Sequence, residues 1–384
     1  MVAPGRRARA ERGLRDPVRT GARLMAGAFA SRGGQRGFIL VATLAALVVL
    51  ALLASAIALS VERARDDQAA ADQAFQDALD AESTRATVLY LAATQRYTFG
   101  GLTVDDAVVL SDDERSALAE GEDIVSYAPT GTEIAMDGTP HQGLGRVWFS
   151  LQDDRGRLSI NFVPRRLLSR WLEAQGAAPG THGDLFARLL DYQDADDLVR
   201  LNGGESAEYL KLGQPPPPNR TLLTPLELRR VLGWNQALAS LSDAELVQNF
   251  AISRAALVNV NTAPREVLAT IPGWDAAVAE RVHAMRRQRG PYASTLDVLA
   301  VAGVPPLDPD GLILFPGETA SLSTWAPGGG RIQLEQWQLT PMEDGGRPWR
   351  TLYKLSLAQP EDPDELTARR PRAKVFTDAT TPDP

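Results

Sequence analysis

The sequence predicts an α+β protein in which a long N-terminal helix packs on an antiparallel sheet and a large α-helical domain is inserted in that sheet. Residues 38–61 form a run of 24 residues without charge, Gly or Pro, and neither Gly nor Pro follows before Gly100. Nothing therefore stops a helix early. Patterns typical of strands occur before residue 164 and again after residue 330. Between them, apolar residues recur with the 3.6-residue period of helices.

The N-terminal helix is predicted to cover residues 38–99, with residues 38–61 crossing a membrane. A helix of that apolar length reaches ~36 Å at ~1.5 Å per residue, enough for a hydrocarbon core of about 30 Å. Beyond it, Phe75 and Leu79 keep helical spacing among carboxylates, so this half is expected to pack one face on another element. The first 37 residues hold nine Arg against two carboxylates, which predicts a cytoplasmic N-terminus.

The region after Gly100 carries the first strand signals. Short strands are predicted at 123–128 and 132–136. A hairpin is predicted to join 146–151 to 157–161 across Asp153-Asp154-Arg155-Gly156, with the Gly placed for a positive φ.

Helical signals then begin at Pro164 and Asp184. Capping boxes are predicted at Thr224 and Ser242, and Asp275 and Ser294 are predicted to cap later helices. Strand patterns return at 331–339 and 351–356, and these strands have no partner unless they rejoin the earlier hairpin. The predicted organisation is a leader at 1–37, the helix at 38–99, a first part of the sheet at 100–163, an inserted helical domain at 164–315, a second part of the sheet at 316–358, and a disordered tail at 359–384.

A basic segment that ends in Gly37, followed by Phe38 and an apolar helix that continues as an amphipathic one, resembles the N-terminus of type IV pilins and pseudopilins. The resemblance implies that a prepilin peptidase cuts between Gly37 and Phe38 and that the new N-terminus is methylated. A start at Met25 would give a leader of ordinary length for the family. The fifth mature position, where the family usually carries Glu, is Ala42. In the family that Glu neutralises a neighbouring subunit's ammonium, and the subunit without it is the K-type minor pseudopilin of type II secretion systems.

The predicted insertion also resembles the K type, which carries a large helical domain within its pilin sheet. The resemblance covers roughly residues 36–358. It implies a structural, non-enzymatic subunit at the tip of a short periplasmic pseudopilus, held in the inner membrane by a single span with its C-terminal domain in the periplasm. The implied partners are the I- and J-type minor pseudopilins and other type II secretion components, besides the prepilin peptidase. The motifs that carry this resemblance are Asp191-Tyr192-Gln193-Asp194-Ala195-Asp196-Asp197, Gly203-Gly204-Glu205, Glu208-Tyr209, Asn219-Arg220 and Leu226-Glu227-Leu228.

Six carboxylates lie within 18 residues of the predicted insertion, and Arg200 is the one base among them. The spacing is not that of an EF-hand, because the Gly at loop position six and the correctly placed Glu are missing. Crowded like charges favour a bound cation, while a solvated acidic loop is the alternative. Hard oxygen ligands in a chain without Cys favour Ca²⁺, and the resemblance implies calcium in this domain. The candidate ligands are Asp191, Asp194, Asp196, Asp197, Glu205 and Glu208.

Residues 258–304 resemble a helix-hairpin-helix unit, as in competence-type DNA receptors, so a membrane-anchored DNA-binding protein is the alternative function. Such units bind phosphate through the backbone N–H groups of a Gly-x-Gly hairpin. Here the hairpin reads Gly273-Trp274-Asp275, whose carboxylate would repel a phosphate, and the positive charge of Arg286, Arg287 and Arg289 lies a helix away. The chain's net charge of −8 becomes −15 without the leader. We therefore expect a packing role and no nucleic-acid partner.

An enzyme is not expected. The three histidines stand in unrelated segments, and neither a G-x-S-x-G motif nor a phosphate-binding loop is present.

Overall fold

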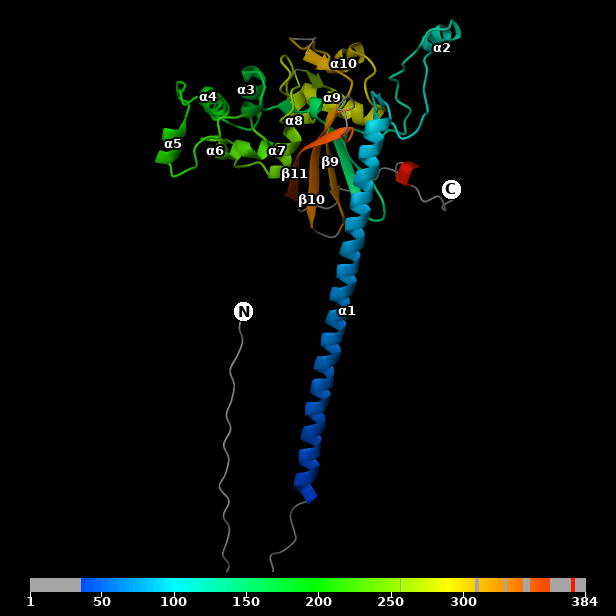
Figure 1. Ribbon diagram of the computed structural model, residues 1–384, viewed down its shortest axis with the longest axis vertical. Coiled ribbons are helices and arrows are strands. Elements are labelled where there is room, and N and C mark those ends of the chain that lie inside the picture. Colours follow the sequence, from blue (N-terminus) through cyan, green and yellow to red (C-terminus); the bar gives the residue numbers. More distant parts are fainter. Residues whose placement is uncertain are drawn as a thin grey trace, which may run out of the picture. The chain divides into compact units, whose positions relative to one another are not determined.

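The computed structural model describes residues 36–255, 257–307, 311–327, 330–340, 346–359 and 374–376 (Figure 1). The chain divides into two compact units, residues 1–70 and 71–384. The predicted leader lies outside the described residues as far as residue 35. Helix α1 (Arg36–Thr94) includes the last two residues of the predicted leader and ends before the predicted helix end at residue 99. Within the described part of the chain, α1 is the one helix that is long and apolar enough to cross a membrane.

The second unit is built on a five-stranded antiparallel sheet with the strand order β11-β10-β9-β4-β3. Neighbouring strands β4 and β9 are far apart in the sequence, and the α-helices from residue 165 to residue 302 lie between them in the chain. The predicted α+β class with a helical insertion is therefore confirmed. The sheet strands are β3 (Asp137–Gln142), β4 (Trp148–Asp153), β9 (Thr319–Trp325), β10 (Arg331–Leu339) and β11 (Trp349–Ala358).

The C-terminal part of α1 packs on this sheet, as a pilin-like fold requires. Val88 and Leu89 are fully buried in one apolar cluster with Phe149, Leu151 and Trp337 from the strands. Burying a large apolar side chain stabilises the fold by about 1.5–3 kcal/mol, so this face holds the helix in place. Two ion pairs also hold this part of α1 in place. The Arg85 guanidinium contacts Glu335 of β10, and Arg146 Nη2 lies 2.7 Å from Asp77 Oδ2.

The helical insertion has a core of its own, in which Trp171, Trp234, Trp274 and Phe250 are completely buried. Three predicted caps form, because the side chains of Ser242, Asp275 and Ser294 each accept a hydrogen bond from a backbone N–H of the following helix. The helices are α3 (Arg165–Ala174), α4 (His182–Gln193), α5 (Ser206–Lys211), α6 (Trp234–Ala237), α7 (Asp243–Asn249), α8 (Arg265–Leu268), α9 (Ala276–Arg289) and α10 (Thr295–Ala302), with 3₁₀ turns η2 (Pro179–Thr181) and η3 (Pro225–Arg230).

The capping box predicted at Thr224 does not form. The segment after it is the 3₁₀ turn η3, and the Thr224 side chain makes no capping hydrogen bond. Glu227 instead accepts a hydrogen bond from the guanidinium of Arg220 at 3.1 Å. Because the Glu227 carboxylate is paired with Arg220, it does not form the capping box with Thr224.

The predicted hairpin at 146–161 is wrong. Strand β4 pairs with β3 and β9, and residues 154–156 form the 3₁₀ turn η1 (Asp154–Gly156). The following strand β5 (Leu158–Ser159) pairs in parallel with β6 (Phe250–Ala251) of the insertion. The reason is that Asp153 and Asp154 are buried and hydrogen-bonded to distant segments, whereas a hairpin turn would expose them.

Other short elements also differ from the predictions. Residues 123–136 form no named strand, although Ile134 makes an isolated bridge to Leu102. Strand β9 was not predicted. It pairs with both β4 and β10, so it connects the C-terminal strands β10 and β11 to the earlier part of the sheet. The remaining described elements are α2 (Asp112–Ala119), β1 (Tyr97–Thr98), β2 (Gly101–Leu102), β7 (Val258–Asn259) and β8 (Leu312–Ile313).

The predicted disordered tail at 359–384 lies outside the described residues apart from Gln359 and the 3₁₀ turn η6 (Lys374–Phe376). Phe376 is 1% exposed, and its ring centroid lies 5.4 Å from that of Phe149 in the sheet core. The prediction of disorder does not hold for these three residues, because an aromatic side chain gains more by burial than the ordered backbone costs.

Candidate cation site in the inserted helical domain

The acidic cluster lies where α4 ends and α5 begins. Asp191 stands in the last turn of α4 and is fully buried. Its Oδ2 accepts hydrogen bonds from the backbone N–H groups of Arg200 at 3.1 Å and Gly204 at 2.9 Å. A Cβ atom at Gly203 would lie 1.9 Å from the same oxygen. The Gly-Gly turn is therefore wrapped tightly around this carboxylate, which fixes its position.

Three of the six predicted ligands come together. Asp191, Asp194 and Glu205 each offer a carboxylate oxygen, and these oxygens lie within 4.8 Å of one another. Glu205 is 3% exposed, and neither of its carboxylate oxygens has a hydrogen-bond partner among the described residues. One oxygen of Asp194 is also buried without a partner there. Buried polar atoms are almost always satisfied in folded proteins, so these three oxygens fit a cation that prefers oxygen ligands.

The electrostatics agree with this geometry. Burial, together with the negative charges of Asp191, Asp194, Asp197 and Asp196, raises the pKa of Glu205 to about 7. A carboxylate with no donor in a field of like charge is unfavourable when ionised, and a bound cation would relieve that repulsion.

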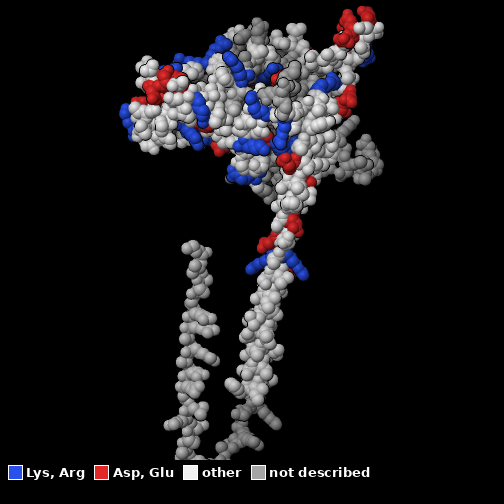
Figure 2. Space-filling view, in the orientation of Figure 1, with Lys and Arg blue, Asp and Glu red and all other residues white. Residues whose placement is uncertain are grey.

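The other three carboxylates accept hydrogen bonds from nearby backbone or side-chain groups. Asp196 Oδ1 accepts from the Leu198 N–H at 2.9 Å, and Asp197 Oδ1 accepts from Ser206 Oγ at 2.9 Å. Glu208 accepts from the Glu205 N–H at 3.2 Å and thus caps α5. Figure 2 shows acidic side chains gathered at the end of the second unit where Figure 1 places α4 and α5. The structure does not bring these three into the group formed by Asp191, Asp194 and Glu205.

Two residues near the site were not predicted as part of it. The Arg200 guanidinium contacts both Asp191, at 2.6 Å, and Asp194. The Asn219 side-chain N–H donates to the Asp196 carbonyl at 3.2 Å, while its amide oxygen is buried without a partner among the described residues. The sequence indicates both residues, since Arg200 is the one base within the acidic cluster and Asn219 belongs to the Asn219-Arg220 motif.

The residues of the predicted processing site lie at the start of α1. Phe38 is 77% exposed, and Ala42 is exposed one turn later. The cut after Gly37 stays a prediction.

The helix-hairpin-helix segment has no phosphate-binding geometry at its hairpin. Gly273 adopts a φ of 95°, Trp274 is fully buried, and the Asp275 carboxylate accepts from the Val278 N–H at 2.8 Å at the start of α9. The N–H groups that would hold a phosphate therefore face a carboxylate.

Arg286 was expected to supply positive charge a helix away from the hairpin, and the structure instead buries this residue. The side chain is 6% exposed, and its Nη1 donates to the carbonyls of Val260 at 2.6 Å and Ala263 at 2.9 Å. Its Nη2 lies 3.8 Å from Asp137 in β3. Arg286 thus connects the insertion to the sheet, and its replacement would report on folding rather than on nucleic-acid binding.

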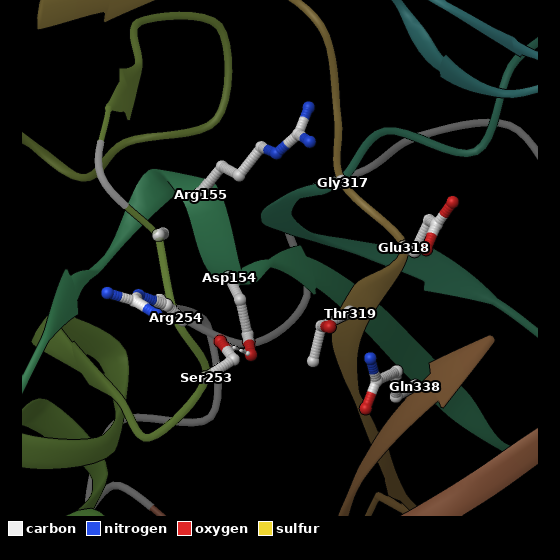
Figure 3. Close-up of a pocket in the computed structure, with 9 residues that line it drawn as sticks. Asp154, Arg155, Ser253, Arg254, Gly317, Glu318, Thr319 and Gln338 are labelled. Atoms are coloured by element: carbon white, nitrogen blue, oxygen red, sulfur yellow. Dashed lines mark hydrogen bonds between the residues drawn. The ribbon is translucent and has the colours of Figure 1, made fainter. Parts of the chain in front are cut away.

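A second polar site lies where β4 leaves the sheet. A hollow of about 270 Å³ is lined by residues of η1, β9 and residues 253–255 (Figure 3). At its floor Ser253 donates to the Asp154 carboxylate at 2.5 Å, while the side chains of Arg155 and Arg254 point in different directions. Burial raises the pKa of Asp154 to about 6. All of these contacts join the insertion to the sheet, so the hollow belongs to this junction.

Two family models match parts of the chain. Residues 151–241 match the family model described as type II secretion system protein K, and residues 253–308 match the helix-hairpin-helix motif. One similar solved structure is a chain of the GspK–GspI–GspJ complex from the type 2 secretion system of enterotoxigenic Escherichia coli. It is 15% identical, covers 77% of this chain and 100% of its own, and has a TM-score of 0.45. No match was found among curated proteins. The match over residues 151–241 confirms the predicted resemblance to the K-type minor pseudopilins.

Proposed function

We propose that the chain is the minor pseudopilin at the tip of a type II secretion pseudopilus and takes part in protein export across the outer membrane. One observation carries the proposal: the protein K match begins in β4 and runs into the helices inserted between β4 and β9 of a pilin-like sheet. In this proposal α1 anchors the chain in the inner membrane and the second unit lies in the periplasm. The role is structural, and no catalytic step belongs to it.

The I- and J-type minor pseudopilins are the proposed partners, packed along the N-terminal helices. The second half of α1 supports this, because Phe75 is 66% exposed and Tyr90 is 63% exposed although Leu89 beside it is buried. Apolar side chains on a helix whose other face is already packed are typical of an interface. Ala42 supports the tip position, since it offers no carboxylate to the ammonium of a further subunit in the apolar filament core.

The proposal is tested by loss and rescue of secretion. A strain lacking the gene should fail to export its type II substrates, and the wild-type gene should restore export. Leu79→Asp, on the exposed face of α1, should abolish both rescue and co-purification with the I- and J-type partners. Leu118→Asp, at a 51% exposed position of α2, is the matched control and should rescue fully. Normal export in the deletion strain would contradict the proposal.

Maturation gives a first prediction. If the bond after Gly37 is the peptidase site, the mature protein begins at Phe38 and is methylated there. Gly37→Val should leave the uncut precursor in the membrane, because the added side chain blocks the position at which the peptidase accepts Gly. Gly34→Val, three residues earlier in the leader, should still be cut. Intact mass spectrometry measures both, and an uncut wild-type chain in cells with active peptidase would exclude maturation at this bond.

We also propose that the insertion binds Ca²⁺ through Asp191, Asp194 and Glu205, with further oxygens from the surrounding cluster or from water. The unpartnered buried oxygens of Glu205 and Asp194 support it. Calcium takes ~6–8 oxygen ligands and accepts flexible geometry, so three converging carboxylates are a sufficient nucleus. The absence of Cys from the chain argues against the softer metals.

The second prediction is a calcium-dependent rise in melting temperature of the full chain in detergent, compared with the same protein in EGTA. Metal that binds the folded state alone stabilises it by about 2.7 kcal/mol at a hundredfold excess over Kd. The rise should vanish in Asp194→Ala with Glu205→Ala. It should persist in Asp112→Ala with Asp113→Ala, a pair of exposed carboxylates in α2. No shift in the wild type and no bound metal by elemental analysis would return the cluster to a solvated acidic loop.

A further inference from the structure

Arg200 occupies the place where a cation would act. Its Nη1 lies 2.6 Å from Asp191 Oδ1 and also contacts Asp194, so one guanidinium nitrogen bridges two of the three converging carboxylates. Glu205, the third, receives no donor among the described residues even though its oxygen lies within 4.8 Å of the others. The guanidinium therefore satisfies two carboxylates and leaves the third without a partner.

A guanidinium and a calcium ion cannot share these two carboxylates. Both carry positive charge, and within a few ångströms of each other in a poorly solvated site they repel by several kcal/mol. A carboxylate oxygen that donates its lone pair to a metal is also less available to the Arg200 N–H group. One cation must leave when the other is bound.

Arg200 is able to leave without unfolding the turn. Its side chain is 41% exposed, so the guanidinium has a route to water. Its backbone N–H holds Asp191 Oδ2 at 3.1 Å independently of the side chain. The loop can thus stay attached to α4 while the side chain swings outward.

We propose that Arg200 is an internal counter-cation that fills the acidic site in the metal-free protein and is displaced when calcium binds. The inference rests on the proposed calcium site and adds its regulation. In the metal-free state Arg200 stabilises the turn between α4 and α5, which would otherwise hold three crowded carboxylates. When calcium binds, metal coordination replaces the ion pair. The apparent calcium affinity is therefore the intrinsic affinity multiplied by the fraction of molecules in which the Arg200 side chain has left the site.

The experiment compares Arg200→Gln with the wild type and with Arg188→Gln, using the full chain in detergent. Arg188 is a matched control, because it is a neighbouring Arg whose Nε donates to the Asn202 carbonyl at 3.3 Å and its removal changes the net charge equally. Calcium affinity is measured by isothermal titration calorimetry, and the melting temperature is measured in EGTA. Arg200→Gln should bind calcium about tenfold more tightly or better, and should melt at a lower temperature than the wild type in EGTA. Arg188→Gln should change the affinity by less than about threefold.

The outcomes separate the inference from the site itself. Calcium binding by the wild type that is weakened or unchanged in Arg200→Gln would overturn the exchange and leave the site in place. Binding by the variant but not by the wild type would support it strongly. If neither protein binds calcium, the site and the exchange both fail. Should Arg200→Gln not fold, Arg200→Lys keeps the charge but loses the forked donor geometry, and it should still bind calcium more tightly than the wild type.

Discussion

Asp153→Ala is expected to lower the free energy of unfolding by about 3–5 kcal/mol, because several buried donors lose their common acceptor. Asp153 is fully buried at the end of β4. Its carboxylate accepts from Asn259 Nδ2 at 2.8 Å, from Thr262 Oγ1 at 2.9 Å and from the Gly317 N–H at 2.9 Å. The substitution would leave these donors without an acceptor in the interior, each at a cost of about 1–3 kcal/mol before relaxation.

The measurement is denaturant unfolding of the full chain in detergent, followed through the fluorescence of its seven Trp residues. Asp113→Ala, an exposed carboxylate of α2, is the control and should change stability by less than about 0.5 kcal/mol. Asp153→Asn should be intermediate, because it keeps one acceptor oxygen but turns an amide N–H₂ toward other donors. A wild-type midpoint in Asp153→Ala would show that the sheet and the insertion are joined by other contacts.

The same residue explains which part of the fold the sequence could predict. Local signals identified α1 and the caps at Ser242, Asp275 and Ser294, because such features depend on residues within a few positions of one another. The turn at Asp153 also carried a strong local hairpin signal, and there the prediction failed. Its partner Gly317 is distant in the sequence, and local turn chemistry contains no information about such a contact.

The candidate cation site was likewise predicted only as far as it depends on residues that are close in sequence. Composition alone located the acidic cluster, since its members are close in sequence. Composition could not select Asp191, Asp194 and Glu205 from the six, because that choice depends on how α4, the Gly203–Gly204 turn and α5 fold together. Arg286 shows the reverse error. An Arg on a helix is usually exposed, yet the tertiary contacts with Val260 and Ala263 place this one in the interior.

Trp234→Ala is the second substitution with a large expected effect, a loss of about 3–5 kcal/mol of stability. Trp234 opens α6, is completely buried, and its indole N–H donates to the Leu185 carbonyl of α4 at 2.9 Å. The substitution removes the largest type of side chain from the core, together with the indole N–H that donates to the Leu185 carbonyl. Because α4 carries Asp191 in its last turn, the calcium-dependent rise in melting temperature should fall as well.

Two further variants separate packing from hydrogen bonding. Trp234→Phe keeps most of the ring volume and loses the N–H, so it should cost about 1–3 kcal/mol. Leu201→Ala, at a position that is 89% exposed in the loop after α4, should stay within about 0.5 kcal/mol of the wild type. Denaturant unfolding gives the stabilities, and melting with calcium or EGTA gives the metal response. If Trp234→Ala lost stability but kept the full calcium response, the acidic site would be organised by its own turn, Gly203–Gly204, rather than by the packing of α4 on the core. That result would show that the loop, rather than α4, positions Asp191. The next residue to substitute would then be Gly203, where a Cβ would lie 1.9 Å from the Asp191 carboxylate.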